Sequence, residues 1–137
     1  MLLLLLAGAG RAEGHWCGLP RAHPVDAAYA QAMARSGGVT VDMHDAQAAA
    51  HAGWDAELNR LYRNAVRSLG KDVRATALRD AQRAWLAWDK AETRSDLARQ
   101  ADGGSIGPVI VSGLAMQRRR ERACTLHAMQ ESDPASN

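Results

Sequence analysis

Two consecutive stretches of this sequence place their large apolar residues at helical spacing, and almost nothing separates them. The first stripe is Trp54, Leu58, Leu61, Ala65 and Leu69, and the second is Val73, Leu78, Ala81, Trp85 and Trp88. Steps of mostly three and four residues are typical of a helix that packs against another helix. The link through Gly70 and Lys71 is short, so we expect the two helices to run antiparallel.

This hairpin also predicts which residues face each other. Antiparallel pairing gives layers of Trp54 with Trp88, Leu58 with Trp85, Leu61 with Ala81, and Ala65 with Leu78. Large residues oppose small ones in two of these layers, as in interdigitated cores. Asn59 is a poor residue for a helix interior, so we expect it to hydrogen-bond to Gln82 or Arg83. The alternative is that Asn59 faces water.

Proline and glycine residues outside the hairpin predict where two more helices begin and end. A short helix follows Pro24 and stops at Gly37, and the hairpin helices cover about 42–69 and about 72–101. A further helix begins near Pro108 and ends near residue 130. The predicted fold is therefore all-α, an antiparallel bundle of three main helices with a short additional N-terminal helix. We expect one helical domain over 13–130 and a disordered tail over 131–137.

The N-terminus, "MLLLLLAGAGRAEG", resembles the apolar region and cleavage site of a signal peptide, which we place at residues 1–12. The apolar run is too short to span a bilayer, and after cleavage we expect no stable membrane insertion. The alternative is an apolar helix of the mature domain. In an oxidising compartment Cys17 and Cys124 either pair or remain two separate thiols, because the sequence fixes no distance between them.

The residues that commonly carry chemistry do not assemble into a known motif. Cys17 has His15 and His23 nearby, but no oxyanion-hole motif accompanies them. His51 and Asp55 share a helical face that is better explained as solvated than as a metal site. We therefore expect no enzyme activity, no cofactor and no metal.

Charge gives little indication of a partner. Seventeen basic and fifteen acidic residues leave a formal net charge of +2, which does not suggest nucleic acid or an anionic membrane. The basic run at 117–122 is expected to be a solvated helix face. Asp89, Glu92 and Asp96 form an acidic ridge on one side of a helix, expected to be an ion-paired surface or else a contact for a basic partner.

The hairpin carries a pattern that resembles the bacterial LprI-like lysozyme-inhibitor family. The matching residues are Asp55, Leu58, Asn59 and Tyr62; Leu78, Ala81, Gln82, Arg83 and Trp85; Gly103, Gly104 and Ser105; and Arg122 and Leu126, with Trp54 beside the first group. The resemblance covers roughly 17–128. Relatives often carry cysteines where Ala32, Ala46, Thr93 and about Gly113 stand here, so the family's disulfides do not transfer.

The resemblance implies a small, helical, exported protein, and at least one branch of the family is associated with lysozyme inhibition. Lysozymes act through two carboxylates in a cleft. The loop over 102–108 is the candidate for entering such a cleft, because its glycines permit close approach and Ser105 carries a donor hydroxyl. Its alternative role is a simple turn between helices.

The resulting interpretation is a periplasmic or secreted binding protein that occludes the active-site cleft of a muramidase. The expected partner is a lysozyme or a related cell-wall hydrolase. The alternative is a structural or envelope-associated helical module, or an immunity-type partner of another cell-wall enzyme. A protein of the first kind reduces lysozyme activity stoichiometrically, and one of the second kind does not.

Overall fold

The computed structural model describes residues 15–132, so the predicted signal peptide and all but the start of the predicted tail lie outside the described residues. A 3₁₀ turn, η1 (Trp16–Gly18), precedes the helices α1 (Pro24–Ser36), α2 (Thr40–Leu69), α3 (Val73–Arg99) and α4 (Ile106–Glu131). Within 15–132 there is no strand, and the all-α prediction is confirmed.

Local sequence signals set the helix ends close to where they were predicted. The side chain of His23 accepts a hydrogen bond from the backbone N–H of Val25 at the start of α1. Asp72 caps α3 in the same way, accepting from the backbone N–H of Arg74 at 2.8 Å. Gly70, with φ +63°, ends α2 in a conformation that residues with a side chain rarely adopt.

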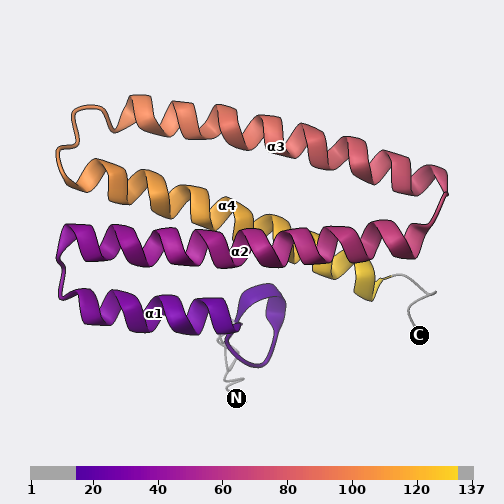
Figure 1. Ribbon diagram of the computed structural model, residues 1–137, viewed down its shortest axis with the longest axis horizontal. Helices are drawn as coiled ribbons and strands as arrows, with labels where there is room; N and C mark the ends of the chain where they lie inside the picture. The colour runs from indigo at the N-terminus through magenta and orange to yellow at the C-terminus, as the bar shows by residue number, and fades with distance from the viewer. Residues whose placement is uncertain (1–14, 133–137) are drawn as a thin grey trace, which may run out of the picture.

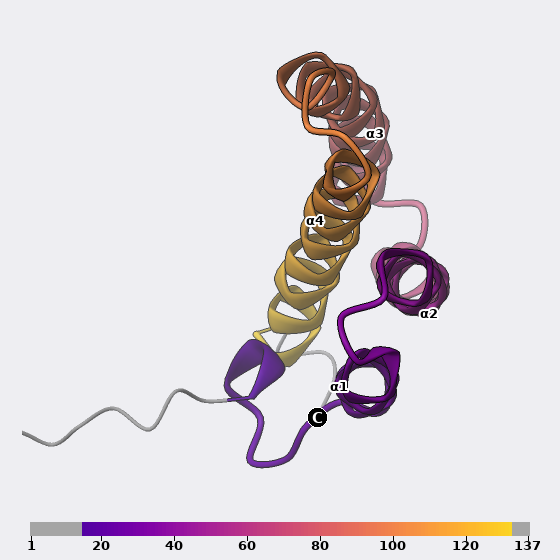
Figure 2. The same cartoon turned by 90° about the vertical axis from the view of Figure 1, so that its left-hand side faces the viewer.

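The main packing partner of α2 is α4, not α3 (Figure 1). Viewed from the end, α1 lies on one flank of α2 and α4 on another, while α3 packs mostly on α4 (Figure 2). The hairpin of α2 and α3 is antiparallel as predicted, yet α4 takes the place along α2 that the sequence assigned to α3. The apolar stripe of α2 predicted a buried face correctly, but not the helix that covers it.

Two of the predicted layers are therefore wrong. Trp54 is fully buried, but its ring lies 5.0 Å from the ring of Trp16 and 4.5 Å from that of His23. Trp88 is 48% exposed, and Ala81 is also exposed. Leu58, Leu61, Ala65 and Leu78 do belong to the buried cluster, and Trp85 packs against it while partly buried. Leu126 and Ala123 of α4 occupy the remaining space over α2.

The two cysteines form a disulfide, so the alternative of two separate thiols is wrong. Cys17 and Cys124 have Cα atoms 5.2 Å apart and join η1 to the last turns of α4. Next to this bond, the indole N–H of Trp16 donates to the backbone oxygen of Arg120 at 2.9 Å. The segment before α1, rich in glycine and proline, thereby contributes a tryptophan to the core.

The helices of the described part are amphipathic rather than uniformly apolar. No helix within residues 15–132 is both long enough and apolar enough to cross a bilayer.

Candidate functional site

The basic run of α4 points into the bundle, so its prediction as a solvated face is wrong. Arg118 donates from Nε to Asp89 at 2.7 Å, from Nη1 to Asp96 at 2.7 Å, and from Nη2 to the hydroxyl of Thr93 at 2.8 Å. Only 10% of its side chain is exposed. A single guanidinium on α4 therefore holds three side chains of α3.

Arg119 extends this network to α2. Its Nε donates to Asp55 of α2 at 3.0 Å, and its Nη1 donates to the second carboxylate oxygen of Asp89 on α3. The guanidinium lies 5.3 Å from the ring centre of Trp85, within the range of a cation–π contact. Residues from three helices thus meet at one arginine.

Two further arginines of α4 tie it to α1 and α3. Arg120 binds the carboxylate of Asp26 on α1 through two nitrogens, the shorter bond being 2.8 Å, and lies 5.7 Å from the ring centre of Trp54. Arg122 donates from Nε to the side-chain oxygen of Gln82 at 3.0 Å. Its Nη2 is buried and has no partner among the described residues. Burial also lowers the pKa of Arg122. We call Arg118, Arg119, Arg120 and Arg122 the α4 arginine cluster.

The predicted acidic ridge is not displayed on the surface. Asp89 and Asp96 are 4% and 1% exposed, and Glu92 is half-buried. Burial raises the pKa of Asp89 and of Asp96, but the hydrogen bonds from arginines outweigh it and hold both pKa values below the ordinary range. Arg118 supplies such a bond to both carboxylates. These two carboxylates are therefore ionised, buried and already paired, and they offer no contact to a basic partner.

The motif residues of the hairpin mostly meet α4 rather than each other. The amide nitrogen of Asn59 donates to Asp55 at 3.2 Å, so the predicted bond to Gln82 or Arg83 is wrong. Arg83 instead pairs with Asp80 on the surface at 3.1 Å. Both side chains thus bond within their own helix, Asn59 to a residue of α2 and Arg83 to a residue of α3, while Gln82 bonds to Arg122 of α4.

Two histidines of α2 lie at the same cleft. His44 and His51 both line a cleft of about 400 Å³ between α2, α3 and α4. Burial, with Arg119 nearby, lowers the pKa of His51. Within 15–132, no group of three or more His, Cys, Asp or Glu side chains is placed to hold a metal ion.

The loop between α3 and α4 is short and sits at one end of the bundle (Figure 1). Gly104 has φ +59°. Gly103 is half-buried, and a Cβ added there would lie 3.1 Å from the backbone oxygen of Gln100, so the chain passes close to the end of α3. Ser105 precedes α4, is exposed, and makes no capping hydrogen bond with its hydroxyl. The loop is thus held close to the helix ends and presents a hydroxyl that caps no helix end.

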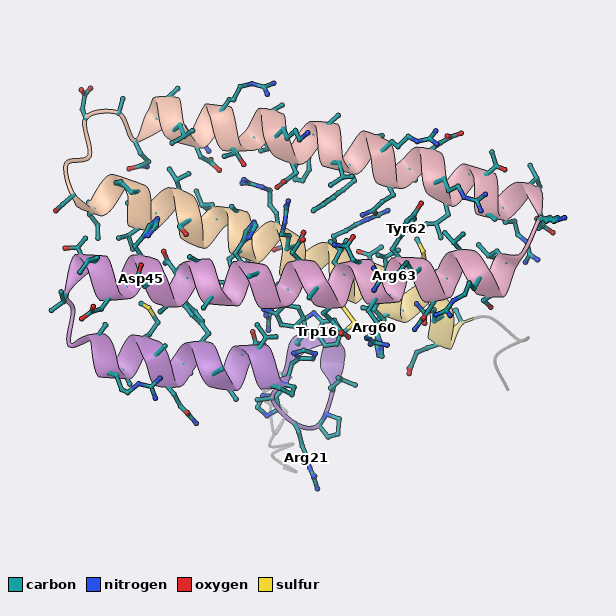
Figure 3. The ribbon with its side chains drawn as sticks, viewed as in Figure 1. Trp16, Arg21, Asp45, Arg60, Tyr62 and Arg63 are labelled. Carbon is teal, nitrogen blue, oxygen red and sulfur yellow. A yellow bond between two sulfur atoms is a disulfide. The ribbon has the colours of Figure 1, made fainter. Side chains whose placement is uncertain are left out.

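A groove of about 390 Å³ lies toward the opposite end, between α2 and α3. Its lining residues are Tyr62, Arg63, Val66, Arg67 and Arg79. Figure 3 shows Tyr62 rising from α2 toward α3, with Arg63 beside it and Arg60 on the other side of the helix. Apart from Tyr62, none of these residues was singled out from the sequence. The sequence feature that could have predicted this groove is the high density of arginines on both sides of the hairpin turn.

The comparison with protein-family models identifies one family for this chain. A family model described as lysozyme inhibitor LprI matches residues 30–126. An uncharacterised protein of Rhizobium meliloti (strain 1021) is 37% identical over 92 residues, which cover 57% of this chain and 64% of that protein. The chain therefore matches less than two thirds of that relative's length. No solved structure matches the chain.

Proposed function

The chain belongs to the LprI lysozyme-inhibitor family, and from this membership we propose that it is a periplasmic or secreted protein that inhibits a muramidase by occluding its active-site cleft. The observation that carries the proposal is the family match, which spans most of the helical domain. The family is one of inhibitors rather than enzymes. The disulfide between Cys17 and Cys124 supports a compartment outside the cytoplasm, where such bonds persist.

The α4 arginine cluster supports the binding role by making the scaffold rigid. Its members join α1, α2 and α3 to α4 through paired side chains, and all its carboxylate partners are already engaged. The aspartates paired within the cluster are therefore not available to donate or accept a proton. A scaffold that is ordered before binding pays less entropy when it binds, which favours inhibition by occlusion.

We assign the contact with the muramidase to the loop that contains Gly103, Gly104 and Ser105. Ser105 is exposed and its hydroxyl caps no helix end, so it is placed to donate to a carboxylate in the cleft. The positive φ of Gly104 lets the backbone turn sharply without a side chain in the way. The acidic ridge plays no part, since Asp89 and Asp96 are buried.

The test is a titration of purified mature protein into muramidase assays with animal-type and bacterial-type enzymes. We expect a stoichiometric loss of activity with at least one enzyme. Full activity of every enzyme at large molar excess of this protein would overturn the proposal and favour an envelope-associated module or an immunity-type partner.

The role of the loop is tested with two variants. Ser105→Trp should weaken inhibition. Ser68 is an exposed serine of α2 far from the loop, and Ser68→Trp should leave inhibition unchanged. Equal inhibition by both variants would remove the loop from the contact.

A further inference from the structure

Positive charge is concentrated at the hairpin end of α2 and α3. Residues 60–83 contain seven basic and two acidic residues, a net charge of +5, whereas the whole chain carries +2. The rest of the chain is therefore net negative, at −3. The basic residues of this segment are Arg60, Arg63, Arg67, Lys71, Arg74, Arg79 and Arg83. A balanced total charge thus conceals one strongly basic end.

Three of these arginines surround one groove. Arg63 and Arg67 lie on α2 and Arg79 on α3, and together with Tyr62 and Val66 they line the space of about 390 Å³. The groove is therefore lined by arginines from two different helices. The phenol of Tyr62 adds the one neutral hydroxyl of the lining.

The cations of the groove have no carboxylate partner. Arg63 and Arg79 make no hydrogen bond or ion pair with any residue of the described part, and Arg67 donates only to the neutral side chain of Asn64. The two acidic residues of the segment are engaged elsewhere: Asp80 binds Arg83, and Asp72 binds Arg74. The groove therefore concentrates positive charge that the protein itself does not neutralise.

The contrast with the α4 arginine cluster makes this arrangement informative. Arg118, Arg119 and Arg120 each have at least one aspartate within 3.0 Å. Where arginines serve to hold this fold together, the chain supplies acids to match them. Around the groove it supplies none, although like charges brought together are unfavourable unless an anion binds between them.

We propose that the groove of Tyr62, Arg63, Arg67 and Arg79 binds a phosphate or phosphodiester group. Guanidinium forks match the oxygens of a phosphate, and a phosphate group carries more negative charge than a single carboxylate. Three arginines around one groove exceed what one carboxylate neutralises. The group comes either from free phosphate or from an anionic polymer with repeated phosphodiesters. Lys71 at the adjacent turn offers further positive charge to such a polymer.

This site is separate from the proposed contact with a muramidase. The groove lies near the turn between α2 and α3, and the loop of Ser105 lies at the other end of α3 (Figure 1). Binding of phosphate and inhibition of a muramidase are therefore independent properties of the chain. A negative result for phosphate binding does not count against muramidase inhibition, and the reverse also holds.

The experiment titrates inorganic phosphate, and separately poly(glycerol phosphate), into the full mature chain in a phosphate-free buffer of fixed ionic strength. NMR shifts of the arginine side chains report binding. The test variant is the double substitution R63Q/R79Q. The matched control is R21Q/R35Q, which removes the same charge at exposed arginines away from the groove. Glutamine keeps a long polar side chain at each position, so we expect both variants to fold. An unchanged helical circular dichroism spectrum checks this.

We expect saturable shifts at the groove and an affinity at least about tenfold weaker in R63Q/R79Q, with little change in the control. Much tighter binding of the polymer per phosphate group identifies a phosphodiester polymer as the ligand. Equal affinity per phosphate identifies a single phosphate. Equal weakening in both double variants, or no saturable shift with either probe, would overturn the proposal, because only general charge attraction would then remain.

Discussion

Arg118 of α4 donates to Asp89 of α3 across 2.7 Å, and the two side chains are only 10% and 6% exposed. The same guanidinium binds Asp96, two turns farther along α3. Buried ion pairs therefore join α3 to the bundle alongside the packing of Leu78 and Trp85, while Trp88 remains on the surface. This explains why the apolar stripe of α3 was a poor guide to its position.

We expect Arg118→Met to destabilise the protein by about 2–3 kcal/mol, at or below the cost of an uncompensated buried charge, because Asp89 and Asp96 each lose one arginine and keep only Arg119 and Arg99. Urea unfolding followed by circular dichroism measures the loss. The matched control is Arg94→Met on the exposed side of α3, which should change the unfolding free energy by less than about 0.5 kcal/mol. A loss below about 1 kcal/mol for Arg118→Met would show that the ion pairs do not hold α3 in place.

Stability should fall in acid because of Asp89 and Asp96. Arginine hydrogen bonds keep the pKa of both carboxyls below the ordinary value of 3.8 in the folded protein. As pH falls, the unfolded chain therefore takes up protons first, and the folded state loses its advantage. The contribution is complete above about pH 5 and declines as pH falls through about 4 toward the folded pKa values. Urea unfolding midpoints measured from about pH 5 downward through about pH 4 test this loss of stability. Asp96→Asn should make the dependence of the midpoint on pH shallower.

The helices were predictable from the sequence because their signals are local. Asp72 and Gly70 act within a turn of their own positions, and the spacing of Leu58 and Leu61 fixes a buried face. The partner of that face was not predictable, because a stripe of large residues packs equally well on any helix of complementary shape. Here Ala123 and Leu126 of α4 lie in the buried cluster with Leu58 and Leu61 of α2.

The side-chain network was less predictable still. Arg120 and Asp26 are 94 residues apart, and nothing in the spacing of either one indicates the other. A run of arginines looks the same whether water or aspartates surround it, so the helix face alone favoured the solvated interpretation. The disulfide stayed open for the same reason, since a separation of 107 residues sets no distance.

Trp85 and Trp88 should differ sharply when each is replaced by alanine. Trp85 packs against the core and lies under Arg119, whereas Trp88 is 48% exposed. We expect Trp85→Ala to cost at least about 1 kcal/mol more than Trp88→Ala, through lost packing and the lost cation–π contact. Thermal or urea unfolding of both variants measures the difference. A larger cost for Trp88→Ala would restore the layer of Trp54 with Trp88.

We expect Gln82 to stabilise the protein through the hydrogen bond that its side-chain oxygen accepts from Arg122. Gln82→Leu removes the acceptor and leaves the half-buried guanidinium, which already has one unpartnered nitrogen, without a side-chain partner. We expect a loss of about 1–3 kcal/mol in unfolding free energy. The neighbouring Arg83→Leu changes an exposed residue and should be close to neutral. Equal effects of the two changes would mean that the buried bond contributes nothing.

The disulfide should be the largest single covalent contribution to stability. It closes a loop of 107 residues, and on the loop-entropy model this limits the unfolded chain by about 4–5 kcal/mol. C17S/C124S should therefore unfold at a markedly lower urea concentration than the oxidised protein, with its helical content retained under native conditions. Adding a reductant to the unmodified protein should reproduce the shift and should leave the double variant unaffected. A midpoint that does not move on reduction would mean that the α4 arginine cluster and the core alone fix η1 against α4.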